Sequence, residues 1–130
     1  MTKHELRAFR AKSREMKQLR EQLADLLSLS APTSEFKAVR GANDNGSAVE
    51  RSVEKIIALT NRYEALLAAY ALERERIEEA FEKLTPDERT VLRAYYFDNL
   101  SWEAVAEHID ISYRHVHRLH SHALQILKEQ

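Results

Sequence analysis

An uninterrupted heptad pattern runs through the middle of the chain and constrains its fold more than any other feature. From residue 49 to residue 84, seam positions recur at alternating spacings of four and three residues, as at the a and d positions of a coiled-coil helix. Only Thr60 and Arg74 are polar among them. The pattern predicts one long helix whose narrow apolar seam is covered by another helix. The seam positions are Val49, Val53, Ile56, Thr60, Tyr63, Leu67, Tyr70, Arg74, Ile77, Phe81 and Leu84.

The N-terminal segment offers a partner for this helix. Within residues 4–28, Phe9, Met16 and Leu23 repeat every seven residues, with Leu19 and Leu26 interleaved. Residues 30–47 contain both glycines and one of the two prolines, so we expect a flexible loop there. We therefore expect an all-α fold in which residues 1–84 form a long antiparallel, coiled-coil-like helical hairpin and oligomerisation region.

The pairing of the two long helices stays open at this point. They can pair within one chain, with a second chain, or both. A narrow seam on a helix of roughly 50 Å favours sharing with another chain, so we expect a homodimer. Arg74, a charged residue at a seam position, would then help to set the register of the helices.

Residues 85–130 carry the signals of three short helices. The start of the first helix is predicted by Thr85, Pro86 and Glu88. Thr85 would be the N-cap, Pro86 would occupy the first helical position, and the Glu88 side chain would bond back to the cap residue. Ser101 and Ser112 predict where the second and third helices begin. A serine hydroxyl at that position can accept a hydrogen bond from a free backbone N–H group of the first helical turn. We expect these helices to close a core that includes Val91, Leu92, Tyr95, Tyr96, Phe97 and Trp102.

The last two of these helices are separated by a turn of three residues, Asp110, Ile111 and Ser112. This is the length expected between the two members of a helix-turn-helix. Asp110 stands where such a turn needs left-handed backbone, and Ile111 should fill the angle between the helices. The spacing predicts a helix-turn-helix domain at residues 85–130.

The helix that follows Ser112 has one apolar sector and an opposite sector that holds no acidic residue. Val116, Leu119, Ala123, Ile126 and Leu127 form the apolar sector. The opposite sector suits the major groove, because phosphates attract positive charge, while Arg, Gln and Ser can hydrogen-bond to base edges. A solvated amphipathic helix is the alternative interpretation. The candidate DNA-binding residues are Ser112, Tyr113, Arg114, His115, His117, Arg118, Ser121 and His122.

From Leu84 to Lys128 the chain resembles region 4 of sigma-70-type factors. The similarity lies in an L-T-P-x-E-R opening, an S-W-E-x-V-A-E first helix, an I-S turn and a V-x-R-L-x-x-x-A-L-x-x-L second helix. The whole chain, with its long N-terminal helices, resembles small phage and prophage transcriptional regulators of the ArpU and RinA type. Position by position, the resemblance assigns DNA reading to Ser112, Tyr113, Arg114, His115, His117 and Arg118.

The resemblance implies a sequence-specific regulator of phage or prophage genes in the cytoplasm of a bacterial host cell. Such a protein binds double-stranded DNA, and it can touch RNA polymerase as region 4 does. Two other classes remain open. A terminase small subunit also joins a helix-turn-helix to oligomerising helices, and a helical protein-interaction module would bind no DNA at all.

Charge is unevenly distributed along the 130 residues. The net charge is −1, yet residues 1–20 hold seven Lys or Arg against two Glu, and the acids concentrate in residues 47–84 and 86–110. Segregation of this kind is typical of a molecule with one DNA-facing side, although ordinary helix faces also produce it. No apolar run approaches the roughly 18 residues of a membrane span, and the chain has no cysteine. We therefore expect a cytoplasmic protein without a membrane partner.

Four closely spaced histidines, at positions 115, 117, 120 and 122, suggest a metal site at first sight. Helical geometry separates them into two pairs that point apart, so one helix cannot supply the three or four convergent ligands of a zinc site. The sequence also lacks a Gly-rich phosphate loop and a nucleophile with an adjacent base. We therefore expect no bound metal, no cofactor and no enzymatic activity.

Overall fold

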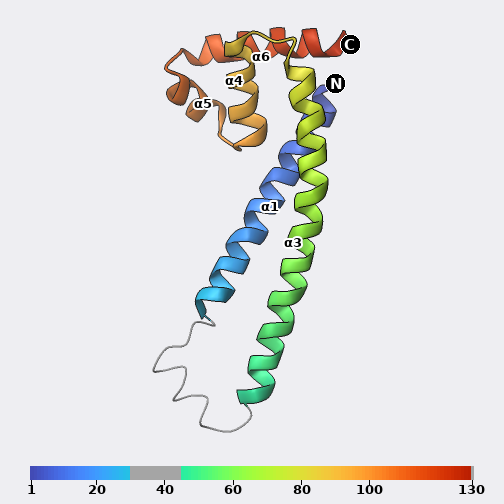
Figure 1. The fold of residues 1–130 in the computed structure, drawn as a ribbon. Helices are drawn as coiled ribbons and strands as arrows, with labels where there is room; N and C mark the ends of the chain where they lie inside the picture. The colour runs from blue at the N-terminus through green and yellow to red at the C-terminus, as the bar shows by residue number, and fades with distance from the viewer. Residues whose placement is uncertain (30–44, 130) are drawn as a thin grey trace. The chain divides into compact units, whose positions relative to one another are not determined.

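The computed structural model describes residues 1–29 and 45–129, and every regular element in these ranges is helical, which confirms the predicted all-α fold (Figure 1). None of these helices combines the length and the hydropathy that a membrane span requires. The predicted loop at residues 30–47 lies mostly outside the described residues, but its last three residues are helical, because the first turn of a helix tolerates Gly46. The elements are α1 (Lys3–Leu29), α3 (Asn45–Phe81), α4 (Pro86–Leu92), the π-helix η1 (Arg93–Phe97), α5 (Trp102–Ile109) and α6 (Tyr113–Lys128).

The chain divides into two compact units, and the division does not fall at residue 84. One unit comprises Met1–Glu15 together with Ala68–Gln130, and the other comprises Met16–Leu67. The start of α1 and the end of α3 therefore belong with the helix-turn-helix. The apolar residues at these helix ends complete a core that residues 85–130 do not fill alone.

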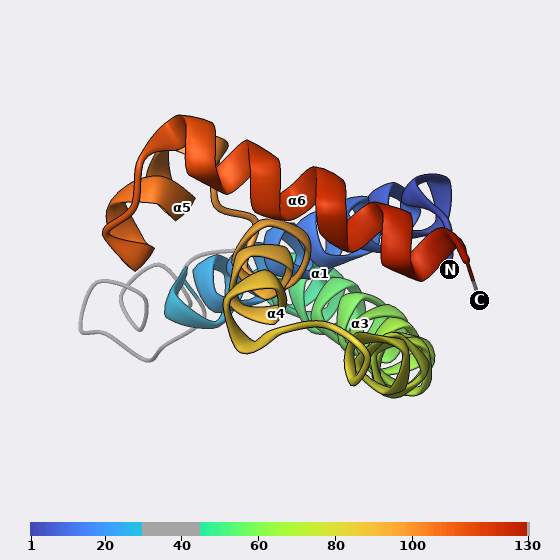
Figure 2. The same ribbon diagram turned by 90° about the horizontal axis from the view of Figure 1, so that it is seen from above.

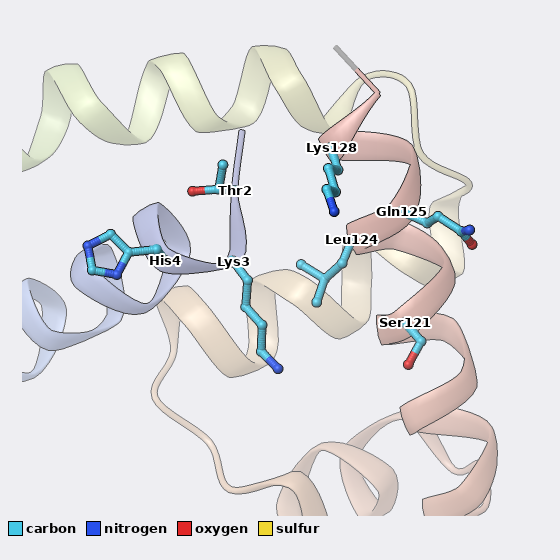
Figure 3. Close-up of a pocket in the computed structure, with 7 residues that line it drawn as sticks. All are labelled: Thr2, Lys3, His4, Ser121, Leu124, Gln125 and Lys128. Atoms are coloured by element: carbon cyan, nitrogen blue, oxygen red, sulfur yellow. The ribbon is translucent and has the colours of Figure 1, made fainter.

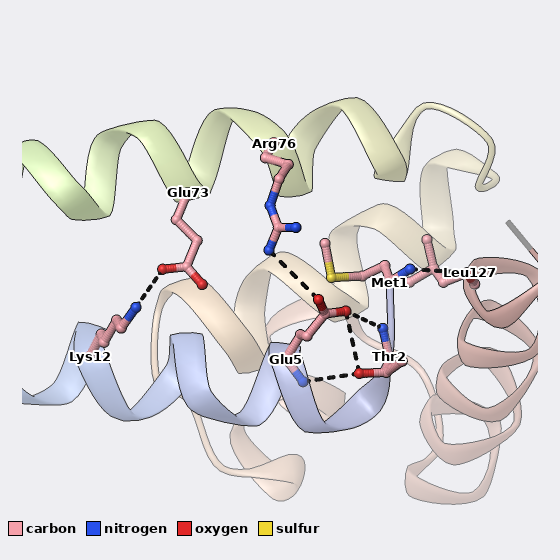
Figure 4. Close-up of polar contacts among 7 residues, drawn as sticks. All are labelled: Met1, Thr2, Glu5, Lys12, Glu73, Arg76 and Leu127. Atoms are coloured by element: carbon pink, nitrogen blue, oxygen red, sulfur yellow. Dashed lines mark hydrogen bonds and ion pairs between the residues drawn. The ribbon is translucent and has the colours of Figure 1, made fainter.

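Within the first unit, the start of α1 and the end of α3 run antiparallel (Figure 4). Lys12 Nζ lies 2.7 Å from Glu73 Oε2, and Arg76 Nη2 lies 3.8 Å from Glu5 Oε1. Residue numbers thus rise along α1 as they fall along α3, as the predicted hairpin requires. Because these ion pairs are largely solvent-exposed, they fix orientation more than they add stability.

The core of this unit is built around Phe97. The Phe9 ring meets Phe97 edge-on with the centroids 5.1 Å apart, and the Phe81 ring stacks on it at 5.6 Å. Phe9 also stacks on Tyr70 at 4.6 Å. Both long helices therefore contribute aromatic side chains to a core that the sequence assigned to three short helices.

The last seam positions of α3 belong to this same core. Ile77, Phe81 and Leu84 are buried against the helix-turn-helix. Arg74, which we expected to set the register of the long helices, holds its guanidinium carbon 4.8 Å from the centroid of the Phe97 ring. A cation over an aromatic face is attracted by the ring quadrupole, which explains this placement.

The second unit contains the remaining parts of the two long helices. On α1, Met16 and Leu19 are buried. On α3, none of the six seam positions from Val49 to Leu67 is buried, and Leu67 is 42 % exposed. This part of the apolar seam is therefore only partly covered.

The two ends of the first unit meet. The start of α1 lies beside the end of α6, as the view from above shows (Figure 2). The amino group of Met1 lies 3.5 Å from the carbonyl oxygen of Leu127 (Figure 4). The first turn of α1 thus flanks the helix that the sequence singled out for DNA binding.

Candidate nucleic-acid interface

The helices α5 and α6 begin with the capping groups that the sequence predicts, and the turn between them has the predicted backbone conformation. The Ser101 hydroxyl accepts from the backbone N–H of Ala104, and the Ser112 hydroxyl accepts from that of His115, each at 3.1 Å. Asp110 adopts the left-handed conformation, with φ 61° and ψ 46°. These three local features confirm a helix-turn-helix with a turn of three residues.

The buried side of α6 is rotated slightly from the predicted one. Val116, Ala123 and Leu127 are fully buried, as expected. Leu119 and Ile126 are only half-buried, and His120 takes a central position in the core instead. The apolar pattern alone could not place His120 inside, because a histidine there needs a partner from another helix.

That partner is Tyr96, a residue of η1. The Tyr96 hydroxyl and His120 Nε2 lie 2.7 Å apart, and the His120 ring packs 4.5 Å from that of Trp102. Burial, assisted by the nearby charges of Lys3 and other residues, lowers the pKa of His120 to about 4. Burial likewise raises the pKa of Tyr96 to about 12. Both side chains are therefore neutral at pH 7, and His120 is a structural residue.

The outward side of α6 presents the candidate residues at its beginning. Arg114, Arg118 and Ser121 are exposed. Tyr113 is also exposed, and its ring meets that of His117 edge-on at 4.4 Å. No acidic residue occurs anywhere between Tyr113 and Lys128. The result is a positively charged surface that combines guanidinium, hydroxyl and aromatic groups.

The remaining candidates have structural contacts as well. Ser112 caps α6 but stays exposed, so its hydroxyl hydrogen remains able to donate. His115 is half-buried. His117 is half-buried too, and its ring lies 5.0 Å from that of Trp102. Ser112 directly precedes α6, and His115 and His117 lie in its first two turns, where a recognition helix contacts bases.

His122 stands at the edge that faces α4. Its Nδ1 lies 3.0 Å from Oε1 of Glu88, a carboxylate that is itself buried. The predicted return bond from Glu88 to the cap does not form, although Thr85 Oγ1 does accept from the Glu88 N–H at 3.3 Å. The Glu88 carboxylate instead faces α6, where its Oε1 contacts His122. With 60 % of its side chain exposed, His122 still borders the outward surface.

The sequence did not point to two further cations beside α6. Lys3 and Arg7 from α1 line a cleft of about 210 Å³ together with His117 and Ser121. The only sequence signal was the excess of basic residues in the first 20 positions. Their position could not be deduced from it, because it depends on the packing of α1 against the helix-turn-helix.

The histidines of α6 do not converge. His117 and His120 contact Trp102, whereas His122 contacts Glu88. Across residues 1–29 and 45–129, no three His, Asp or Glu side chains gather in a way that could hold a metal ion.

Comparison with known proteins agrees with this geometry. Residues 80–129 match the family described as Sigma-70, region 4. No curated protein and no solved structure matched the chain. The match begins at the end of α3 and spans α4, η1, α5 and α6. Residues 80–129 are a sigma-70 region 4-like helix-turn-helix, which supports a DNA-binding regulatory role for this chain.

Proposed function

We propose that this protein is a sequence-specific transcriptional regulator that reads the major groove of duplex DNA with the outward side of α6. The acid-free surface of α6 carries the proposal. Arg114 and Arg118 are both exposed and lie one helical turn apart, so they can reach neighbouring base edges. Each arginine can form a bidentate contact with guanine, and Ser121 can add a hydrogen bond to a base or a phosphate.

The surroundings of α6 support insertion into a groove. The Tyr96–His120 bond and the Ser112 cap hold its inner side and its first turn, so the outward residues stand on a fixed element. A binding helix whose backbone is already fixed loses less conformational entropy when it binds. The exposed Tyr113 is suited to an apolar contact with the methyl group of thymine.

The proposal that the target genes belong to a phage or prophage rests on the layout of the chain. Long N-terminal helices followed by a C-terminal helix-turn-helix resemble the ArpU and RinA type of regulator. A gene position just upstream of terminase genes would support a regulator of late genes. A contact with RNA polymerase follows from the same resemblance, and co-elution with purified bacterial RNA polymerase would test it.

We also propose that the protein acts as a homodimer. The partly covered seam of α3 supports this, since Leu67 and Val53 remain exposed on it. A two-fold dimer would present two copies of α6, and its target would then be a palindrome with two half-sites.

Selection from a randomised duplex pool tests the regulator proposal. The wild-type chain should enrich one sequence motif, and a duplex that carries the motif should bind it more tightly than a scrambled duplex of the same composition. Failure to retain any duplex at 50 mM salt would contradict DNA binding and favour a protein-interaction module. A ring-shaped oligomer in the same preparation would instead favour a terminase small subunit.

A further inference from the structure

A second positively charged element borders α6 at the start of α1. A cleft of about 440 Å³ lies between the two helices (Figure 3). Lys3 lines it from α1, and Leu124 and Lys128 line it from α6. In Figure 3 these three side chains point into the space between the helices, whereas His4 and Gln125 point away from it.

A neighbouring cleft continues this surface along α6. Lys3 lines both clefts, and Arg7 joins it in the second, opposite His117 and Ser121. Because Lys3 and Arg7 are four residues apart on one helix, they lie on the same side of it. The two cations therefore form a row beside the middle of α6.

In the part of the chain that the structure describes, no acidic counter-charge lies in the clefts beside this row. None of the described residues that line the two clefts is acidic. Glu5, which lies between the two cations in sequence, bonds instead to Thr2 and pairs with Arg76 (Figure 4). Burial is the main cause of the lowered pKa of His120, and the nearby charges of Lys3 and Arg7 lower it further, so these charges reach α6.

The row stands on a well-anchored helix. Leu6 and Phe9, on the inner side of the same turns of α1, are fully buried. Arg10 Nε donates to the carbonyl oxygen of Tyr95 at 2.9 Å, and its guanidinium carbon lies 4.1 Å from the centroid of the Tyr95 ring. Lys3 and Arg7 are thus held beside α6 by the core and not by a free tail.

We propose that Lys3, Arg7 and Lys128 bind the phosphates of the DNA strand that flanks α6 in the major groove. The inference rests on the proposed groove binding of α6. A helix in a major groove about 12 Å wide has a phosphate backbone along each side, and cations beside it position the protein without reading sequence. The start of α1 would then hold the phosphate backbone of the DNA beside α6, and we call this role of Lys3, Arg7 and Lys128 the phosphate clamp, or simply the clamp.

Salt dependence of binding tests the clamp. The probe is a labelled duplex recovered from a randomised pool with the wild-type chain, titrated by fluorescence anisotropy between 50 and 300 mM salt. Each phosphate contact adds about 0.9 to the slope of log affinity against log salt. The double variant Lys3→Gln and Arg7→Gln should therefore lower the slope by about 1.8, and it should weaken selected and scrambled duplexes equally.

The double variant Lys17→Gln and Arg20→Gln is the matched control. It removes the same charge from exposed positions of the same helix, in the other unit. We expect its slope to stay within experimental error of the wild-type slope. Equal slopes for the two double variants would overturn the clamp.

Two further readouts separate the clamp from the proposed function. Ethylation of single phosphates should interfere with wild-type binding at positions where the Lys3 and Arg7 double variant is insensitive, and identical interference patterns would overturn the clamp. The double variant Arg114→Gln and Arg118→Gln can lose its preference for the selected duplex over the scrambled one while the Lys3 and Arg7 variant keeps the salt slope of the control. In that case the clamp is wrong and the proposed function stands. If the wild-type chain binds no duplex, the proposed function fails with it.

Discussion

The Tyr96 hydroxyl and His120 Nε2 lie 2.7 Å apart in the interior of the first unit, and their bond joins η1 to α6. His120 is only 6 % exposed. A buried imidazole with one polar partner is stable while it is neutral, but protonation would leave a buried charge. The fold of the first unit is thereby linked to pH.

This linkage predicts a loss of stability in acid. Since burial lowers the pKa of His120 to about 4, below the ordinary value of about 6.5, the unfolded state binds a proton more readily than the folded state. The contribution of His120 is therefore complete above about pH 6.5 and is lost progressively as the pH falls towards 4. It amounts to about 3 kcal/mol at most. Urea unfolding between pH 7 and pH 4 measures it.

The variant His120→Gln isolates this contribution, because glutamine does not titrate and can still bond to the Tyr96 hydroxyl. Its free energy of unfolding should fall less than that of the wild type over this pH range. The variant His108→Gln, at an exposed position of α5, should follow the wild type. If His120→Gln and His108→Gln show the same pH dependence, His120 is not the titrating group.

The second prediction concerns the joint core of α1 and the helix-turn-helix. Replacement of Phe9 by Ala removes a buried ring that contacts Phe97 and Tyr70, so it should cost roughly 3 to 5 kcal/mol of unfolding free energy. Leu27→Ala, at a position of the same helix that is 57 % exposed, should cost about 0.5 kcal/mol or less. Urea unfolding monitored by circular dichroism compares them.

A fragment of residues 85–130 provides the complementary experiment. It lacks Phe9, Ile77 and Phe81, which are fully buried in the complete chain. We expect it to unfold at a much lower urea concentration than the full chain. Equal midpoints would show that the short helices form a sufficient core alone.

The third prediction separates two serines of the interface. Ser112→Ala removes the hydroxyl that caps α6, which should cost about 1 kcal/mol of stability. Ser121→Ala, on the exposed surface of the same helix, should leave stability nearly unchanged and weaken DNA binding only. Thermal unfolding and anisotropy are measured on both variants. A Ser112→Ala variant with the stability of the Ser121→Ala variant would contradict the capping role.

The fourth prediction tests the proposed homodimer. Leu67→Asp places a charge on the partly covered seam, where association would bury it at a high cost. Light scattering at micromolar concentration should give the mass of two chains for the wild type and of one chain for this variant. Leu72→Asp, at a position off the seam that is 72 % exposed, should remain dimeric. A monomeric wild type at that concentration would contradict the proposal.

The sequence predicted well those features that depend on neighbouring residues. Caps at Ser101 and Ser112 and the left-handed turn at Asp110 are local choices of the backbone, and all three were readable from residue type and spacing. The long helices also followed from their repeat. Such signals need no knowledge of tertiary packing.

Features that depend on distant contacts were missed. The π-helix η1 was not expected, nor was the positive φ of Asn99 that follows it. His120 was not placed in the core, because its partner Tyr96 comes from another element. Lys3 is near α6 only because α1 packs beside it. The sequence pattern of a heptad seam is also the same whether the seam packs against a second chain or, as at Ile77, against the core of its own chain.

The most direct test of the account is the affinity of the double variant Arg114→Gln and Arg118→Gln for the selected duplex. If both side chains read bases, the loss of each should cost about 1 to 3 kcal/mol of binding free energy, or roughly 5-fold to 150-fold in affinity for the selected duplex. The affinity for a scrambled duplex should fall much less. The double variant Lys17→Gln and Arg20→Gln should retain its discrimination between the two duplexes. An Arg114 and Arg118 variant that stays folded and still prefers the selected duplex as strongly as the wild type does would contradict the assignment of α6 as the reading helix.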